Sequence, residues 1–100
     1  MNVVELNMDK IKVLCSRHRV KNLYVFGSLL KDSFHDDSDI DLLVDFSKVD
    51  LEEYADNYFD LKEELEAIFK RPVDLLEEKG IRNPFLRKQI DLEKQLIYGS

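Results

Sequence analysis

The sequence predicts an α/β (α+β) domain, with a small mixed β-sheet of three to four strands flanked by about four helices. Apolar residues between positions 51 and 68 step by three and four, the spacing of an amphipathic helix. Short runs rich in β-branched, aliphatic and aromatic residues at 22–26, 39–46 and 72–76 are typical of strands. The 100 residues contain no repeat and no linker, so we expect a single domain spanning 1–100.

Composition and charge exclude several classes of protein. The apolar fraction of 44% excludes wholesale disorder, and no apolar run approaches the roughly 18 residues of a membrane span. The start, MNVVELNMDK, lacks the basic flank and apolar stretch of a signal peptide, so we expect a cytoplasmic protein without a membrane partner. Residues 32–78 hold 17 Asp/Glu against four Lys/Arg. Because nucleic acid is bound by clustered lysine and arginine, direct polynucleotide binding is disfavoured.

The first helix is expected over about Met8 to Arg19, with Asn7 as its N-cap. One face of this helix collects the residues that we expect to be buried, Met8, Ile11, Leu14, Cys15 and His18. A single cysteine cannot form an internal disulfide, so Cys15 is interpreted as a buried, reduced thiol. His18 is interpreted as a partly buried histidine at the helix end rather than a ligand.

Residues 22–26 (NLYVF) predict a buried strand, after which Gly27-Ser28 turns the chain and SLLKD begins a short helix. The segment DIDLLVDF at 39–46 predicts the second strand. Because side chains alternate along a strand, its residues divide between two faces. Ile40, Leu42 and Val44 are expected on one face, and Asp39, Asp41, Leu43 and Asp45 on the other.

The next helix has the clearest pattern in the chain, and Asp50 and Glu53 are placed to form a capping box at its start. Its apolar stripe consists of Leu51, Tyr54, Tyr58, Leu61, Leu65 and Ile68. Pro72 should stop this helix, and PVDLL should form a short third strand. Asn83-Pro84 is a suitable N-cap and N1 pair for a last helix that continues to about Ile97.

Acidic residues crowd the segment between the first two strands. Five lie within ten positions, Asp32, Asp36, Asp37, Asp39 and Asp41. Like charges this close repel, so either water screens them or a cation lies among them. Asp39 and Asp41 are two residues apart on one strand, so their side chains should leave the same face about 6–7 Å apart. Carboxylates placed this way suit Mg²⁺, which also binds phosphate oxygens.

Asp74 lies inside the third predicted strand. If that strand neighbours the Asp39–Asp41 strand, three carboxylates would meet around two cations about 3.5–4 Å apart, an arrangement that serves phosphoryl and nucleotidyl transfer. The alternative is an aspartate on an edge strand that faces water. Gly27-Ser28 could add a phosphate cradle, because a glycine that leaves a strand lets backbone N–H groups approach an anion closely.

The pattern G-S-x10-D-x-D, followed by an aspartate in an apolar strand, resembles the nucleotidyltransferase signature of the polymerase beta superfamily. Nearly the whole chain resembles the minimal nucleotidyltransferases (MNT proteins), which consist of little besides this catalytic domain. The resemblance implies a polymerase beta-like nucleotidyltransferase fold and two bound Mg²⁺. It also implies that Asp39, Asp41 and Asp74 are the catalytic metal ligands, and that Gly27, Ser28 and Lys31 bind the nucleotide triphosphate. Asp32 stands where the family often has glycine.

Proteins of this kind act as antitoxins, and the resemblance implies transfer of AMP from ATP to a tyrosine of a HEPN ribonuclease toxin. The HEPN-type toxin and ATP are therefore the expected partners. Two alternatives stay open: an antitoxin that binds and occludes its toxin with weak or no catalysis, and a nucleotidyltransferase with a small-molecule acceptor. A plain α/β domain with a solvated acidic loop is the remaining, non-enzymatic interpretation.

Overall fold

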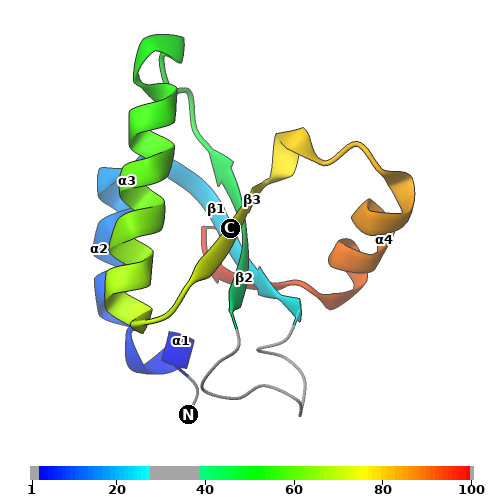
Figure 1. Cartoon of the computed structure of the whole chain (residues 1–100), viewed down its shortest axis with the longest axis horizontal. Coiled ribbons are helices and arrows are strands. Elements are labelled where there is room, and N and C mark those ends of the chain that lie inside the picture. Colours follow the sequence, from blue (N-terminus) through cyan, green and yellow to red (C-terminus); the bar gives the residue numbers. More distant parts are fainter. Residues whose placement is uncertain (1–2, 28–38, 100) are drawn as a thin grey trace.

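The computed structural model describes residues 3–27 and 39–99, which form a four-stranded mixed sheet between two layers of helices (Figure 1). In chain order the elements are α1 Val3–Leu6, α2 Met8–Arg17, β1 Val20–Phe26, β2 Ile40–Phe46, α3 Leu51–Phe69, β3 Val73–Glu77, the 3₁₀ turn η2 Glu78–Gly80, α4 Pro84–Glu93 and β4 Gln95–Tyr98. The predicted fold class is confirmed. The short helix expected from SLLKD lies outside the described residues.

The strand order is β3-β2-β1-β4, so β3 and β4 form the two edges of the sheet. β1 runs antiparallel to both β2 and β4, whereas β2 and β3 are parallel. Parallel neighbours need a crossover connection, which α3 supplies between β2 and β3. Figure 1 shows α2 and α3 together on one face of the sheet and α4 on the other. None of the helices in the described ranges combines the length and apolar character needed to cross a bilayer.

Two apolar cores lie on the two faces of the sheet. The main core joins the sheet to α2 and α3 and includes Ile40, Leu42 and Val44 of β2. The second core lies on the α4 side and is built from Phe26, Leu43 and Ile90. The predicted alternation of β2 is therefore confirmed, and the strand is buried from both sides.

The predicted course of the last helix is wrong. Its start is correct, because the Asn83 side chain accepts hydrogen bonds from two backbone N–H groups of α4. The helix ends at Glu93, however, and Lys94 adopts an extended backbone that leads into β4. There Ile97 reaches the main core, and β4 supplies hydrogen bonds to an edge of β1 that would otherwise lack a partner strand. Tertiary pairing thus overrides the helical pattern of residues 94–97.

The first predicted helix begins at Met8 with Asn7 at the N-cap position, as predicted, but it ends earlier than predicted. It stops at Arg17 rather than Arg19, because Arg19 has a left-handed backbone (φ 57°) that turns the chain directly into β1. A separate single turn, α1, precedes it and was not predicted. Asn7 lies between the two helices without capping α2 in the described structure, since its side-chain Nδ2 donates instead to the Val3 carbonyl at 2.8 Å.

The start of α3 also departs from prediction. Within the described residues the Asp50 side chain makes no capping hydrogen bond, and Glu53 bonds to Asp50 through its backbone N–H at 2.9 Å, so the predicted capping box is wrong. Leu51 is 91% exposed instead of buried, because the first turn of α3 extends beyond the sheet (Figure 1). Leu61 and Leu65, further along the same stripe, are fully buried.

The burial predicted for Cys15, and the position of His18 at the helix end, are confirmed. Cys15 is a free, buried thiol, and burial raises its pKa to about 12. His18 is buried at the end of α2, where Nδ1 lies 2.8 Å from the Leu14 carbonyl oxygen and Nε2 lies 3.1 Å from a Glu64 carboxylate oxygen. The histidine therefore links α2 to α3 on the side of the sheet away from α4.

Candidate active site

Two of the three predicted carboxylates lie side by side on neighbouring strands. In the parallel register of β2 and β3, Asp41 is paired with Asp74, and paired backbones in a sheet lie about 4.8 Å apart. The residues before and after each aspartate are buried in the main core. Because side chains alternate along a strand, both aspartates leave the sheet on its other face, the side that carries α4.

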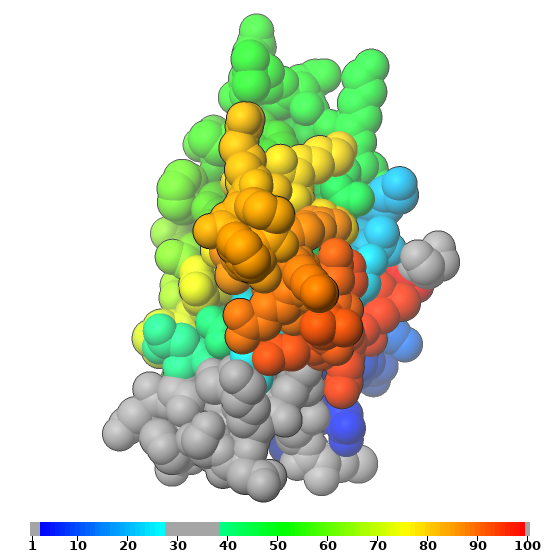
Figure 2. Space-filling model, turned by 90° about the vertical axis from the view of Figure 1, so that its right-hand side faces the viewer, coloured from blue at the N-terminus to red at the C-terminus, as the bar shows by residue number. Residues whose placement is uncertain are grey.

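Asp39 immediately precedes β2 and is exposed, as is Asp74, whereas Asp41 is half-buried. The backbone at this point is ordered by a hydrogen bond from the Ile40 N–H to the Pro72 carbonyl at 3.1 Å. Figure 2 shows the teal start of β2 and the yellow-green start of β3 at the surface, to the left of the orange atoms of α4. The three aspartates therefore come from two adjacent strand starts at one end of the sheet.

Gly27 follows the last residue of β1 and packs directly against Asp41. Its φ of 72° lies in the left-handed region that glycine adopts most easily. A Cβ at this position would lie 2.3 Å from the Asp41 Oδ2 atom, far inside van der Waals contact. The absence of a side chain at residue 27 thus leaves the space that the Asp41 carboxylate occupies. Two other residues predicted to bind the triphosphate, Ser28 and Lys31, lie outside the described residues.

The side chains at this end of the sheet have the donor chemistry for an oxygen-ligated divalent cation. Carboxylate oxygens are the ligands that Mg²⁺ prefers, and the register brings Asp41 and Asp74 together. Among the described residues, however, no group of three His, Cys, Asp or Glu side chains is arranged to hold a metal ion. Asp39 and Asp41 each take part in a polar or electrostatic interaction within the protein. The three-carboxylate metal site stays a prediction.

Side chains of α3 form hydrogen bonds to β3, the strand that carries Asp74. The sequence does not predict this role. The Tyr58 hydroxyl donates to the Leu75 carbonyl, and the Tyr54 hydroxyl donates to a Glu77 carboxylate oxygen at 2.6 Å. Burial, followed by the negative charges of Glu77 and Asp74, raises the pKa of Tyr58. Burial and the hydrogen bond to Glu77 raise the pKa of Tyr54. The hydroxyls therefore stay protonated as donors at neutral pH.

The two tyrosines in the apolar stripe of α3 are the sequence feature that could have indicated these hydrogen bonds. Two tyrosines four residues apart face a short strand, so their rings pack beside the core while their hydroxyls need acceptors. The sequence predicts that both tyrosines belong to the core, and the packing of their rings against the main core confirms this prediction. Their hydrogen-bond partners could not be inferred, because those partners depend on where β3 lies.

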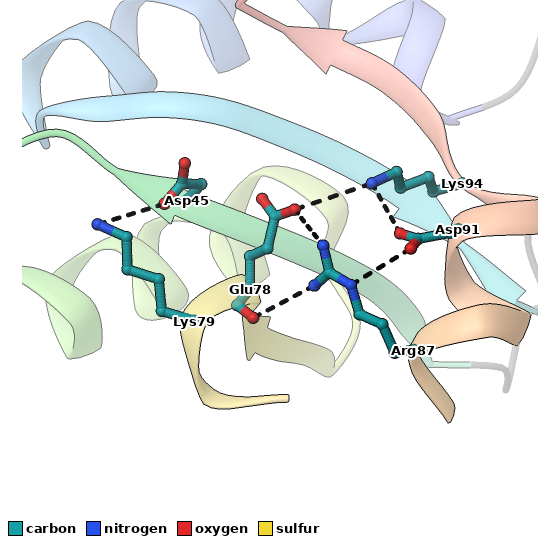
Figure 3. A network of polar contacts seen from close by, with 6 residues as sticks. All are labelled: Asp45, Glu78, Lys79, Arg87, Asp91 and Lys94. Atoms are coloured by element: carbon teal, nitrogen blue, oxygen red, sulfur yellow. Dashed lines mark hydrogen bonds and ion pairs between the residues drawn. The ribbon is translucent and has the colours of Figure 1, made fainter. Parts of the chain in front are cut away.

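A network of charged side chains holds α4 over the face from which the aspartates emerge (Figure 3). Arg87 contacts the Glu78 carboxylate at 2.7 Å and Asp91 at 3.3 Å, and Lys94 contacts Asp91 at 2.9 Å. Lys94 also lies 4.5 Å from the centre of the Tyr24 ring on β1. The hydrogen bond to Glu78 raises the pKa of Arg87, and the hydrogen bond from Lys94 lowers the pKa of Asp91. The network joins η2, α4 and the sheet.

Comparison with solved structures supports the fold. A structure provisionally described as a minimal nucleotidyltransferase superimposes with a TM-score of 0.77 at 31% identity, covering 95% of this chain and 95% of that chain. A toxin–antitoxin structure with AMP-PNP superimposes with a TM-score of 0.72 at 24% identity, covering 94% of this chain and 74% of that chain. A Shewanella oneidensis complex of a tri-AMPylated HEPN toxin with an MNT antitoxin gives a TM-score of 0.67 at 22% identity, over 97% and 73% of the two chains.

Sequence comparison identifies the family. The chain is 37% identical over 87 residues to MJ1379 of Methanocaldococcus jannaschii, which carries the provisional name of a protein adenylyltransferase, and the match covers 87% of this chain and 84% of the relative. It is 33% identical over 72 residues to the protein adenylyltransferase MntA of Thermococcus cleftensis, over 72% and 70% of the two chains. The family described as Polymerase beta, Nucleotidyltransferase matches residues 9–100. The expectation from the sequence is confirmed, and the chain belongs to the polymerase beta nucleotidyltransferase family.

Proposed function

We propose that this protein is an antitoxin that transfers AMP from ATP to a tyrosine hydroxyl of a HEPN-type ribonuclease toxin. The observation that carries the proposal is the pairing of Asp41 with Asp74 across parallel strands, with Gly27 packed against Asp41. The names of its relatives support the reaction, since they are protein adenylyltransferases. One structure with the same fold contains an AMPylated HEPN toxin, which supports a HEPN protein as the acceptor.

The aspartates and the glycine take different roles in this proposal. Asp39, Asp41 and Asp74 would hold two Mg²⁺, which when bound supply positive charge that neutralises the phosphates and acidifies the acceptor hydroxyl. Gly27 would let the backbone approach the triphosphate, because no side chain at this position intervenes. Ser28 and Lys31 would complete the contacts to the triphosphate.

The proposed reaction is an in-line displacement at the α-phosphorus of ATP. The tyrosine oxygen attacks the α-phosphorus of ATP, and the bond from that phosphorus to the oxygen bridging the α- and β-phosphates breaks, so pyrophosphate leaves. The tyrosine hydroxyl is mostly protonated at neutral pH, since its free pKa is near 10. Asp74 is exposed on the edge strand and can accept this proton. The products are O-adenylylated tyrosine and pyrophosphate.

The experiment incubates the protein with isotope-labelled ATP and Mg²⁺, with and without the product of its neighbouring gene, and measures AMP on the partner by mass spectrometry. Asp41→Asn keeps the shape of the side chain but removes the charge, so we expect AMP transfer to be abolished while folding is retained. Asp60→Asn is the matched control, because Asp60 is exposed on α3, on the side of the sheet away from the candidate site.

The outcomes separate this proposal from the two alternatives. Silencing of the toxin without added AMP would favour an antitoxin that acts by occlusion. Transfer to an aminoglycoside but not to the partner protein would favour a small-molecule acceptor. Transfer by Asp41→Asn at the wild-type rate would contradict the assigned carboxylates.

A further inference from the structure

We propose that Glu66 and Tyr58 of α3 are positioning residues that hold Asp74 in place for catalysis. The inference rests on the proposed function, because it assigns these residues to the same site. It concerns β3, an edge strand that has a neighbour on one side only. An edge strand frays more easily than a central strand, and its unpaired backbone groups need other partners.

The direction of the backbone groups on β3 follows from one hydrogen bond. The Pro72 carbonyl faces β2, where it accepts from the Ile40 N–H. Backbone groups of successive residues on a strand point to alternate sides. Those of Asp74 therefore face β2, whereas those of Val73 and Leu75 face away from the sheet. The two neighbours of Asp74 are thus the residues that lack a partner strand.

Two side chains of α3 provide the missing partners. A Glu66 carboxylate oxygen accepts the Val73 N–H at 2.9 Å, and the Tyr58 hydroxyl donates to the Leu75 carbonyl. One bond lies immediately before Asp74 and the other immediately after it. The backbone of Asp74 is therefore held by β2 on one side and, through its neighbours, by α3 on the other.

Glu66 also organises the turn between α3 and β3. Its backbone carbonyl accepts the Lys70 N–H at 2.8 Å, closing the left-handed cap at the end of α3, where Lys70 has a φ of 58°. Its side chain reaches Val73 at the first position of β3. One residue thus bonds to both ends of the connection that leads to Asp74. A shift at this turn would move the Asp74 carboxylate relative to Asp41, its partner on β2.

The test compares three substitutions on α3. Glu66→Ala removes the acceptor of the Val73 N–H, whereas Glu66→Gln retains an acceptor oxygen of nearly the same reach. Glu63→Ala is the matched control, since Glu63 is exposed one turn earlier on the same helix. Each variant is assayed for transfer of AMP from MgATP to its partner protein, with kcat and the KM for ATP measured separately. The exchange of the Val73 amide hydrogen is followed by NMR on the protein alone.

We expect Glu66→Ala to lower kcat by about ten- to a hundredfold, because small displacements of catalytic groups have effects of this size. The KM for ATP should change by less than about twofold, and Glu66→Gln should stay within about threefold of the wild-type kcat. Exchange of the Val73 amide should accelerate about tenfold or more in Glu66→Ala only. A kcat of Glu66→Ala equal to that of Glu63→Ala, or a kcat of Glu66→Gln as low as that of Glu66→Ala, would overturn the inference.

Tyr58→Phe keeps the test decisive if Glu66→Ala does not fold. It removes one hydroxyl from a ring that still packs on the core, and we expect a lower kcat with the KM for ATP unchanged. Wild-type kcat in Tyr58→Phe would contradict its positioning role. The failure of the proposed function looks different, since the wild type itself would then transfer no AMP to its partner protein. The exchange of the Val73 amide depends on neither ATP nor the partner, so it reports on the Glu66 contact by itself.

Discussion

Replacement of Gly27 by alanine tests the packing at the centre of the candidate site. The Cβ would lie 2.3 Å from the Asp41 Oδ2 atom, whereas ordinary van der Waals contact begins at 3.4 Å. The carboxylate must therefore retreat by about 1 Å, or the end of β1 must move by the same amount. Gly27 is also left-handed, with a φ of 72°, which an alanine adopts only at a cost.

The steric clash and the left-handed backbone both lower the free energy of unfolding. A left-handed backbone costs an alanine about 1 kcal/mol relative to glycine, and forcing a packed neighbour to move adds about 1 kcal/mol. A loss of about 2 kcal/mol in the free energy of unfolding corresponds to a fall of roughly 10 °C in Tm for a domain of this size. If the proposed function holds, the displaced Asp41 should also slow AMP transfer by about a hundredfold.

The assay measures Tm by calorimetry and AMP transfer by mass spectrometry for the wild type and Gly27→Ala. Gly80→Ala is the control, because the nearest atom to a Cβ at Gly80 is the Glu77 Cβ at 3.9 Å, an ordinary contact. Repeating Gly27→Ala in an Asp41→Ala background removes the two closest contacts and leaves only the Asp41 Cβ at 3.3 Å, so mainly the backbone part of the destabilisation, about half, should remain. A Tm of Gly27→Ala equal to that of Gly80→Ala would refute the packing argument.

Three further predictions concern the core, the buried thiol and the metal. Leu61→Ala should lower the free energy of unfolding by about 2–5 kcal/mol, since Leu61 is fully buried. Leu51→Ala, at a position that is 91% exposed, should change it by less than about 0.5 kcal/mol in urea unfolding. The folded Cys15 thiol has a pKa of about 12, against 9.0 in the unfolded chain, so the unfolded chain loses its proton first as pH rises. Stability should therefore fall above pH 9 by about 1.4 kcal/mol per pH unit from this thiol, and alkaline unfolding of Cys15→Ala should lack that contribution. Mg²⁺ should raise the Tm of the wild type by ligand linkage, and EDTA should reverse the rise; an equal rise in Asp41→Asn would exclude this carboxylate from the site.

Local sequence patterns determined most of the secondary structure. The three- and four-residue steps of α3 predict the face that Leu61 and Leu65 bury, and the alternation of β2 predicts that Ile40 and Leu42 face the main core. These patterns are readable because burial of one face requires the same repeat as the helix or strand itself. The spacing from Gly27 to Asp41 likewise identified the family without knowledge of the fold.

Tertiary structure decided the features that depend on residues far apart in the chain. Residues 95–98 become β4 because β1 offers them an open edge, although the sequence predicts a helix that continues to about Ile97. The parallel register that pairs Asp41 with Asp74 depends on how α3 crosses over the sheet. The bonds from Glu66 and Tyr58 to the edge of β3 arise in the same way. No local period encodes such contacts, because they depend on the free energy of the packed sheet rather than on the repeat of any single segment.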